Sequence, residues 1–430
     1  MVEEIVIEHL TRVEGHGAIR VLIDGSKVKD VKLELFEGPR FIEKILVGKM
    51  YYEAPDIVAR ICSICPEPHQ IATVEAIEKA FRASVGRQIK LLRELQLLAD
   101  VISSHALHLY FLALPDYLGY PDVFSMTSKY GQEIRVGLQL KKTGNAIKET
   151  VSGRSIHGCT VKPGGYTRIP SVEELEWLSK LLKQSIEGAL MTVKLFSSFD
   201  YPDFARDENV FMAVDPGSAY GFSGDHILIS TGEKYPVEEY KLLTNEVALP
   251  YSTAKRSTYR GKSFMVGALA RIALNGSKLR GQAAEMLKDV ESKLDLMNPL
   301  TNNLAQAIEL VYAIGRAIDI IDELLDEGLK QDTEVRLKPV KGLGASCVEA
   351  PRGTLYHCYE LDDDGRVVKA DIVTPTAQNA ANIEKYIKIS VERLLPRAYR
   401  ELERFLELIA RAYDPCISCA THLIKVERIH

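Results

Sequence analysis

Hydrophobic and polar residues alternate along the first 37 positions of the chain, which is the pattern of half-buried strands. We predict three short strands there, over residues 4–10, 17–23 and 27–36. Asp24-Gly25 falls between the second and third runs and is typical of a tight hairpin turn. The N-terminal segment is therefore expected to form a small antiparallel β portion.

From residue 41 onward the apolar positions recur every three or four residues, which predicts helices. Residues 200–262 differ, because they are richer in Gly, Pro, Tyr and polar residues and are expected to be irregular. The pattern as a whole predicts a mainly α protein with small β portions, in the α+β class. The expected helices cover residues 68–83, 88–113, 171–198, 300–329 and 377–412, the last interrupted at Pro396.

No repeat, low-complexity tract or obvious linker divides the chain. We therefore expect one interwoven domain over residues 1–430 rather than separate folding units. Its expected parts are an N-terminal β portion (1–40), a helical core (41–199), an irregular region (200–265), a helical segment (266–346), a β-hairpin (347–376) and a C-terminal helix with a ligand loop (377–430).

The hairpin near the C-terminal end has a further consequence. Two strand-like runs, residues 353–360 and 366–373, are joined by the turn-rich connector Leu361-Asp362-Asp363-Asp364-Gly365. Because pairing runs outward from the turn, it brings Arg352 close to Thr374 and Pro375. An always-charged guanidinium is thus expected beside a Thr-Pro-Thr segment at the open end of the hairpin.

Two Cys-x-x-Cys pairs stand at opposite ends of the chain, Cys62 with Cys65 and Cys416 with Cys419. Thiolates are soft ligands for zinc, iron, nickel or copper, and this spacing lets both sulfurs reach one metal. We therefore expect one four-thiolate site that joins the two ends. Structural zinc is the commonest interpretation of two such pairs, but zinc ribbons usually close over loops of about 15–20 residues. The other three cysteines, Cys159, Cys347 and Cys358, are expected to be small buried hydrophobic residues.

Composition narrows the class of protein. The chain has 430 residues, 46% of them hydrophobic and 26% charged, and a net charge of −5, which argues against nucleic-acid binding. No stretch reaches the ~18–20 apolar residues that a membrane span needs. Met1 to Leu10 contains three glutamates, unlike a signal peptide. A cytoplasmic location is expected, where cysteine pairs bind metals rather than form disulfides.

The motifs together resemble the large subunit of nickel–iron hydrogenases. Four further segments extend the likeness in the family's order, and Ser63 and Pro66 are more similar to the soluble cytoplasmic branch. The segments that carry the resemblance are Arg60-Ile61-Cys62-Ser63-Ile64-Cys65 with His69, Asp414-Pro415-Cys416-Ile417-Ser418-Cys419-Ala420-Thr421-His422, Arg12-Val13-Glu14-Gly15-His16, Ser104-His105 to Tyr110, Ala350-Pro351-Arg352-Gly353 and Thr374-Pro375-Thr376 to Asn379.

The resemblance implies a nickel–iron centre held by the four cysteines. Cys62 and Cys416 would be terminal ligands of nickel, and Cys65 and Cys419 would bridge nickel to an iron. That iron would have carbon monoxide and cyanide ligands, installed by maturation proteins. The same resemblance implies a fold like that of the hydrogenase large subunit, with a mainly helical body.

Two side chains acquire catalytic roles through the resemblance. Arg352, after Pro351, would overhang the metals and bond a cyanide, while Thr374, Pro375 and Thr376 would hold the other cyanide. Glu14 would receive the proton from a terminal thiolate, which we assign to Cys416. Without the family context, Arg352 is typical of a salt-bridge partner and Glu14 of a solvated strand residue.

A magnesium site is also implied. Glu43 lies 19 positions before Cys62, the spacing at which the family places a carboxylate ligand. His422 and the backbone carbonyl of Ile372 would complete the protein ligands, together with waters. Family members are typically trimmed after the histidine that matches His422, whereas this chain continues through Leu423 to His430.

The function that the resemblance implies is reversible cleavage of H2 into two protons and two electrons by a catalytic subunit. Only three cysteines remain for an iron–sulfur cluster, so the electrons must leave through another protein. The resemblance implies that this protein is an iron–sulfur small subunit. Further subunits would serve a flavin with NAD(P), a deazaflavin or ferredoxin. Two alternatives remain open: a non-catalytic electron-transfer scaffold related to the quinone-site subunit of complex I, which lacks the four cysteines, and a structural zinc protein.

Overall fold

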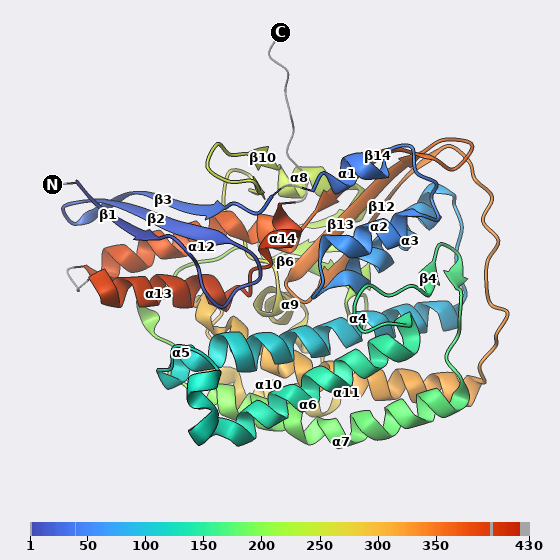
Figure 1. Ribbon diagram of the computed structural model, residues 1–430, viewed down its shortest axis with the longest axis horizontal. Coiled ribbons are helices and arrows are strands. Elements are labelled where there is room, and N and C mark those ends of the chain that lie inside the picture. Colours follow the sequence, from blue (N-terminus) through green and yellow to red (C-terminus); the bar gives the residue numbers. More distant parts are fainter. Residues whose placement is uncertain (1, 39, 396–398, 422–430) are drawn as a thin grey trace, which may run out of the picture.

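The N-terminal segment forms a three-stranded antiparallel sheet in the order β1-β2-β3 (Figure 1). The computed structural model describes residues 2–38, 40–395 and 399–421. Strands β1 (Val2–Ile7), β2 (Gly17–Asp24) and β3 (Lys27–Leu35) confirm the predicted β portion, although β1 begins and ends earlier than expected. The turn between β2 and β3 has Gly25 at φ 63°, which glycine adopts without steric cost.

A layer of long helices lies on the opposite side of the molecule (Figure 1). It consists of α4 (Arg87–Leu107), α6 (Thr127–Ser152), α7 (Val172–Ser197) and α11 (Asn302–Glu327). The expected helices at 88–113, 171–198 and 300–329 are thus confirmed, the first ending in a π-helical segment, His108–Ala113. Helix α6 was not predicted. The run Arg87–Leu118 is apolar enough to cross a membrane but is mostly buried here, as a core helix is.

A second antiparallel sheet has four strands in the order β14-β13-β12-β7. Strands β13 (Gly353–Leu361) and β14 (Val367–Val373) confirm the predicted hairpin. Strand β12 (Gly342–Ala350) begins inside the segment 266–346 that was expected to be helical, and it pairs with β13 and with β7 (Ser223–Gly224). That expectation was wrong for residues 342–346, because the run is rich in glycine and its strand character depends on burial against other elements.

Helix α3 (Pro66–Ala80) packs against strands β12 and β13 at short range. A Cβ atom at Gly344 would lie 2.0 Å from the carbonyl oxygen of Ala76, and one at Gly342 would lie 2.2 Å from that of Ala80. Only glycine lets strand β12 and helix α3 come this close. The contact fixes the position of α3, which begins directly after Cys65. The helix expected at 68–83 is confirmed with slightly earlier bounds.

The region expected to be irregular contains short strands. They form a three-stranded sheet in the order β6-β8-β9 and a two-stranded sheet of β10 and β11, so the expectation was partly wrong. Their bounds, with those of the helices in and after this region, are β6 (Met212–Asp215), β8 (His226–Ile229), β9 (Lys234–Pro236), β10 (Val247–Ala248), β11 (Lys255–Arg256), α8 (Tyr240–Thr244), α9 (Ala268–Asn275) and α10 (Gly281–Val290).

The C-terminal part consists of α12 (Pro375–Leu394), α13 (Tyr399–Ala412) and the short α14 (Ile417–Ala420). This confirms two helices where an interrupted one was predicted, while Pro396 itself lies outside the described residues. The remaining short elements are α1 (Ile42–Leu46), α2 (Ala54–Val58), α5 (Leu114–Leu118), β4 (Val161–Lys162) and β5 (Gly165–Tyr166). The fold is therefore mainly helical with small antiparallel sheets, as predicted.

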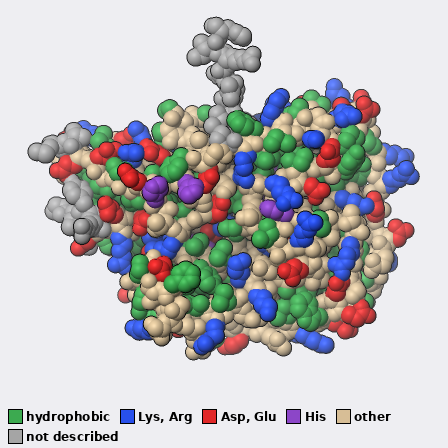
Figure 2. Space-filling model, viewed as in Figure 1, with side chains coloured by type: hydrophobic (Ala, Val, Ile, Leu, Met, Phe, Trp, Pro, Cys, Tyr) green, Lys and Arg blue, Asp and Glu red, His purple; other side chains and the backbone are tan. Residues whose placement is uncertain are grey.

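Positive and negative side chains are interspersed over the face shown in Figure 2. Hydrophobic side chains occur among them in small groups. This mixed distribution agrees with the net charge of −5 and gives this face no broad basic area.

Candidate metal centre

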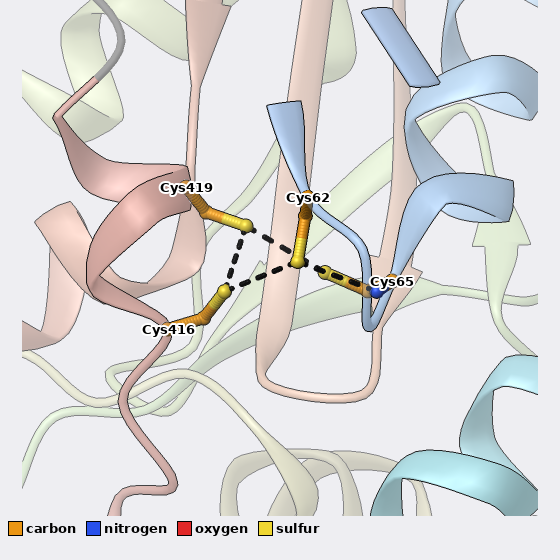
Figure 3. A group of neighbouring side chains, drawn as sticks. All are labelled: Cys62, Cys65, Cys416 and Cys419. Carbon is orange, nitrogen blue, oxygen red and sulfur yellow. Dashed lines mark hydrogen bonds between the residues drawn. The ribbon is translucent and has the colours of Figure 1, made fainter. Parts of the chain in front are cut away.

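The four paired cysteines meet in the interior (Figure 3). All their Sγ atoms lie within 4.8 Å of one another, and all four side chains are buried. The sulfur of Cys62 is 3.3 Å from that of Cys416, and the sulfur of Cys65 is 3.6 Å from that of Cys419. The sulfurs of Cys416 and Cys419 are 2.9 Å apart. The predicted four-sulfur cluster is thus present, with ligands from both ends of the chain.

Local structure positions the thiols of Cys62 and Cys65. Cys62 follows the 3₁₀ turn Ala59–Ile61, and Cys65 stands directly before helix α3. The backbone N–H groups of Ile64 and Cys65 donate to the sulfur of Cys62 at 3.3 and 3.4 Å. Such donors favour a thiolate at Cys62, which is the form that binds a metal.

A guanidinium clamps the two cysteine loops together. Arg40 donates to the carbonyl oxygens of Arg60 at 2.8 Å and Ile61 at 2.6 Å, and also to that of Ser418 at 2.7 Å. The first two acceptors precede Cys62, whereas Ser418 lies between the other two cysteines. The sequence analysis missed Arg40, because bonds to backbone carbonyls leave no motif in a sequence.

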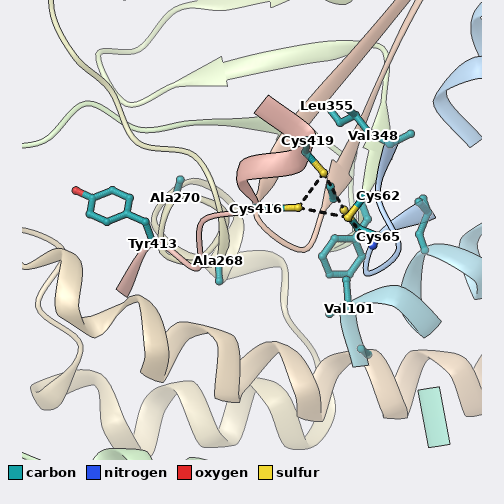
Figure 4. Close-up of a cluster of buried hydrophobic side chains, with 14 of the residues drawn as sticks. Cys62, Cys65, Val101, Ala268, Ala270, Val348, Leu355, Tyr413, Cys416 and Cys419 are labelled. Atoms are coloured by element: carbon teal, nitrogen blue, oxygen red, sulfur yellow. Dashed lines mark hydrogen bonds between the residues drawn. The ribbon is translucent and has the colours of Figure 1, made fainter. Parts of the chain in front are cut away.

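The thiols lie in the apolar core, beside residues such as Val101, Val348 and Leu355 (Figure 4). Their protonation is uneven. Hydrogen bonding with the neighbouring thiols, that of Cys416 above all, holds the pKa of Cys62 well below its usual range, whereas burial raises the pKa of Cys416 and of Cys419 well above it. Four anions this close in a low dielectric repel one another, so cations are needed for all four to ionise. The donor set fits soft transition metals.

The carboxylate of Glu14 touches this cluster. Cys416 Sγ donates to Glu14 Oε2 at 3.1 Å, and the backbone N–H of Ser418 donates to the same oxygen at 3.0 Å. The Ser418 hydroxyl donates to Glu14 Oε1, and the backbone N–H of Ile417 donates to the Glu14 carbonyl at 2.9 Å. The structure thus brings together the two residues that were predicted as proton donor and acceptor.

Arg352 is buried next to the thiols. Its Nε donates to the carbonyl oxygen of Asp414 at 2.6 Å and its Nη2 to Asp414 Oδ1 at 2.9 Å. Although burial opposes a charge, Asp414 and the thiols of Cys416, Cys65 and Cys62 raise the pKa of Arg352 well above its usual value. The guanidinium is therefore cationic beside the sulfurs.

The predicted cofactor-binding residues gather on the same side. Thr376 Oγ1 accepts a hydrogen bond from the backbone N–H of Cys416 at 2.9 Å, and Thr374 and Pro375 open helix α12 beside it. The carbonyl of Pro351 accepts from Arg271 at 3.0 Å. Two buried polar atoms, Arg352 Nη1 and Thr374 Oγ1, have no hydrogen-bond partner among the described residues. Such atoms fit a polar, non-protein group bound in this space.

Two of the three residues predicted for magnesium are adjacent. Glu43 on α1 is buried, and its Oε1 accepts a hydrogen bond from the backbone N–H of Ile372 at 2.8 Å. The contact is through the Ile372 amide, while the prediction concerned its carbonyl. His422 lies outside the described residues.

The other three cysteines differ in burial. Cys347 and Cys358 are buried in strands β12 and β13, as expected. Cys159 is exposed, so the expectation of burial was wrong there, since it lies in a loop after α6 rather than in a strand or helix. His69, which follows the first cysteine pair, bonds His357 at 3.0 Å between ring nitrogens.

Comparison with known proteins gives a consistent result. The nickel-dependent hydrogenase family matches residues 40–154 and 225–422, and a HoxL-like family matches residues 4–37. The alpha chain of sulfhydrogenase 2 of Pyrococcus furiosus is 42% identical over 423 residues, which cover 98% of this chain and 100% of that protein. One chain of the vhu F420-non-reducing hydrogenase of Methanocaldococcus jannaschii is 32% identical, covering 90% and 98%.

A solved structure extends the likeness to the fold. The crystal structure of an NAD+-reducing [NiFe]-hydrogenase in the H2-reduced state superposes with a TM-score of 0.87 at 26% identity, covering 98% of this chain and 99% of that one. The two sequence relatives are components of larger enzymes, which implies a partner protein here. The matches cover nearly the whole chain and include all four cysteines, and they show that this protein belongs to the nickel-dependent hydrogenases as a large, catalytic subunit.

Proposed function

We propose that this protein catalyses the reversible heterolytic cleavage of H2 to two protons and two electrons. The observation that carries the proposal is the contact between Cys416 Sγ and Glu14 Oε2, at the edge of four buried thiols. A soft ligand set next to a carboxylate is what heterolysis needs, because one product of the cleavage is a proton. No observation favours the scaffold related to complex I or the structural zinc protein.

The four cysteines would hold nickel and iron, with Cys62 and Cys416 as terminal ligands of nickel and Cys65 and Cys419 as bridging ligands. When bound, such a centre supplies electron-rich, soft metals with an open position for dihydrogen. Arg352 Nη1 and Thr374 Oγ1, which have no hydrogen-bond partner in the described part of the chain, support carbon monoxide and cyanide as further iron ligands, because buried donors require an acceptor. Pro351, Pro375 and Thr376 would line the same space.

Glu14 would take the proton from Cys416 Sγ at its Oε2 and release it toward the surface. The N–H of Ser418 and its hydroxyl hold the carboxylate in place for this transfer. Arg352 would stabilise negative charge beside the sulfurs. Asp414 accepts hydrogen bonds from its Nε and Nη2 and so holds the guanidinium in place.

Glu43, the carbonyl of Ile372 and His422 would bind magnesium, which prefers oxygen ligands completed by water. The buried position of Glu43 beside Ile372 supports this assignment. The ion would link residue 422 to helix α1.

Electrons would leave through an iron–sulfur small subunit. Cys347 and Cys358 are buried in strands β12 and β13, and Cys159 is exposed. These three cysteines therefore do not form a site for an iron–sulfur cluster. Further subunits would serve a flavin with NAD(P), a deazaflavin or ferredoxin, and the enzyme would be cytoplasmic. Maturation proteins would install the iron ligands.

The test is Glu14→Gln in the purified complex. Glutamine keeps the shape of the side chain but cannot accept the proton. We expect hydrogen–deuterium exchange with solvent to fall by roughly 100-fold or more, within the range of general acid–base catalysis, while nickel and iron contents stay at wild-type levels. Glu8→Gln, at an exposed position of the same segment, is the matched control. Normal exchange in Glu14→Gln would refute the assigned proton route.

A further inference from the structure

A cluster of three ionisable residues is buried beside the loop that joins Cys62 to Cys65. Lys148 on α6 is 2% exposed, and Asp100 on α4 and Glu67 on α3 are fully buried. The ammonium of Lys148 forms an ion pair with Asp100 and lies 3.7 Å from Glu67 Oε2. Burying an ammonium is costly unless it is paired, so its presence here needs a reason.

Close helix packing places the lysine. A Cβ atom at Gly144, one turn before Lys148, would lie 2.7 Å from the carbonyl oxygen of Ala99 and from the backbone nitrogen of Ser103. The glycine therefore lets α6 approach α4 at the level of Asp100. Lys148 is thereby brought between α4 and the first turn of α3, which begins at the residue after Cys65.

The ammonium also contacts the metal loop itself. Lys148 Nζ donates to the carbonyl oxygen of Ile64 at 3.4 Å, and the N–H of Ile64 donates to Cys62 Sγ. The same peptide segment is thus bonded to a cation on one side and to a thiol on the other. Although burial opposes the charge, Asp100 and Glu67 raise the pKa of Lys148, so it stays cationic.

We propose that Lys148 is a positioning residue that fixes the Cys62–Cys65 loop and supplies a second buried positive charge, besides Arg352, to the four-sulfur site. The proposal rests on the nickel–iron function above. Up to four thiolates in an apolar core need compensation beyond the metals, and one permanent charge within a few residues of them changes the electron density at the site. Asp100 partly neutralises this charge, because it is the direct ion-pair partner of the ammonium. It therefore determines how strongly the charge of Lys148 acts on the four-sulfur site.

The test compares three variants of the complete hydrogenase by infrared spectroscopy of the iron-bound carbon monoxide. Lys148→Met keeps the length of the side chain and removes its charge, so more electron density at iron should shift the band to lower wavenumber. Asp100→Asn leaves the ammonium less neutralised and should shift it to higher wavenumber. Lys142→Met, an exposed position on the same helix, should leave the band in place.

Opposite shifts in the two buried variants support the proposal, since loss of packing alone would not reverse the sign. Bands unchanged in both, or shifted in the same direction, would overturn it. If Lys148→Met yields no folded enzyme, the upward shift in Asp100→Asn decides alone, and its absence contradicts the role of Lys148. No carbon monoxide band in the wild type would refute the proposed iron ligands, and this inference with them.

Discussion

Arg352 is held by two hydrogen bonds to one residue, Asp414, and its third nitrogen, Nη1, is buried without a hydrogen-bond partner among the described residues. This fork geometry distinguishes arginine from lysine, whose ammonium is a point charge. We expect Arg352→Lys to retain nickel and iron but to lose hydrogen oxidation roughly 100- to 1,000-fold, the usual effect of removing one electrostatic donor. Hydrogen uptake by the purified complex measures this, and near-normal turnover would contradict the role of the guanidinium.

At the scale of single residues, spacing alone was enough to predict the four cysteines as one site. The hairpin argument also placed Arg352 beside the segment of Thr376, and both now lie at the cluster. Arg40 and Lys148 could not be predicted, because they act through the backbone carbonyls of Ile61, Ser418 and Ile64. A hydrogen bond to a backbone carbonyl does not depend on the side chain of the accepting residue, so the sequence gives no sign of it.

Among the elements, the helix with a clear capping box was predicted to within one residue at each end. Helix α7 begins after Ser171, whose side chain forms a capping box with Glu174, and its predicted bounds were correct to one residue. Helix α6 was missed, since Gly131, Gly137 and Gly144 interrupt its apolar pattern. Those glycines become meaningful only in the fold, where Gly137 and Gly144 allow other elements to approach.

The contact between β12 and α3 makes a prediction at this scale. Gly344→Ala places a methyl group 2.0 Å from the carbonyl oxygen of Ala76, so strand and helix must separate. We expect a loss of about 1–3 kcal/mol in the free energy of unfolding, together with lower nickel retention, because α3 begins beside Cys65. Thermal unfolding and metal analysis measure the two effects.

Gly315→Ala is the matched control for this substitution. Position 315 lies in helix α11 with nothing within 4 Å of an added Cβ, so alanine should be neutral or stabilising by up to about 1 kcal/mol. Equal effects of the two substitutions would contradict the packing argument for Gly344.

For the whole molecule, a buried ion network connects distant parts of the chain. Arg271 on α9 bonds Glu309 on α11 at 2.6 and 2.7 Å and Glu349 on β12 at 2.8 Å. Because the partners would be left buried and unpaired, Arg271→Ala should cost about 3–5 kcal/mol of unfolding free energy. The exposed pair of Arg260 with Glu233 is the control, and Arg260→Ala should leave the free energy of unfolding nearly unchanged, because solvent screens an exposed ion pair.

This network also has a pH dependence. Burial opposes ionisation of Glu309, but Arg271 outweighs it and lowers its pKa to about 2. The stabilisation is therefore complete above the ordinary glutamate pKa and is lost as the pH falls from there toward 2. Burial raises the pKa of Glu349, so we assign the effect to Glu309. The difference in unfolding temperature between wild type and Arg271→Ala should narrow in acid, and a constant difference would contradict the assignment.

The largest group of buried hydrophobic residues extends from Ile5 to Ala420, which supports our proposal that residues 1–430 form one interwoven domain. Sequence patterns predicted the class of fold and its β and helical parts, but not which distant segments meet. The meeting of residue 14 with residue 416 in a β-bridge is an example, because it depends on the whole chain being folded.

The central claim is that the four thiols hold nickel and iron for hydrogen cleavage, and metal counting in the purified native complex tests it most directly. The account predicts about one nickel per copy of this chain, iron in excess of nickel, and loss of nickel in Cys416→Ser, since a terminal thiolate ligand would be removed. About one zinc per chain with no nickel would contradict it and would assign the four cysteines a structural role.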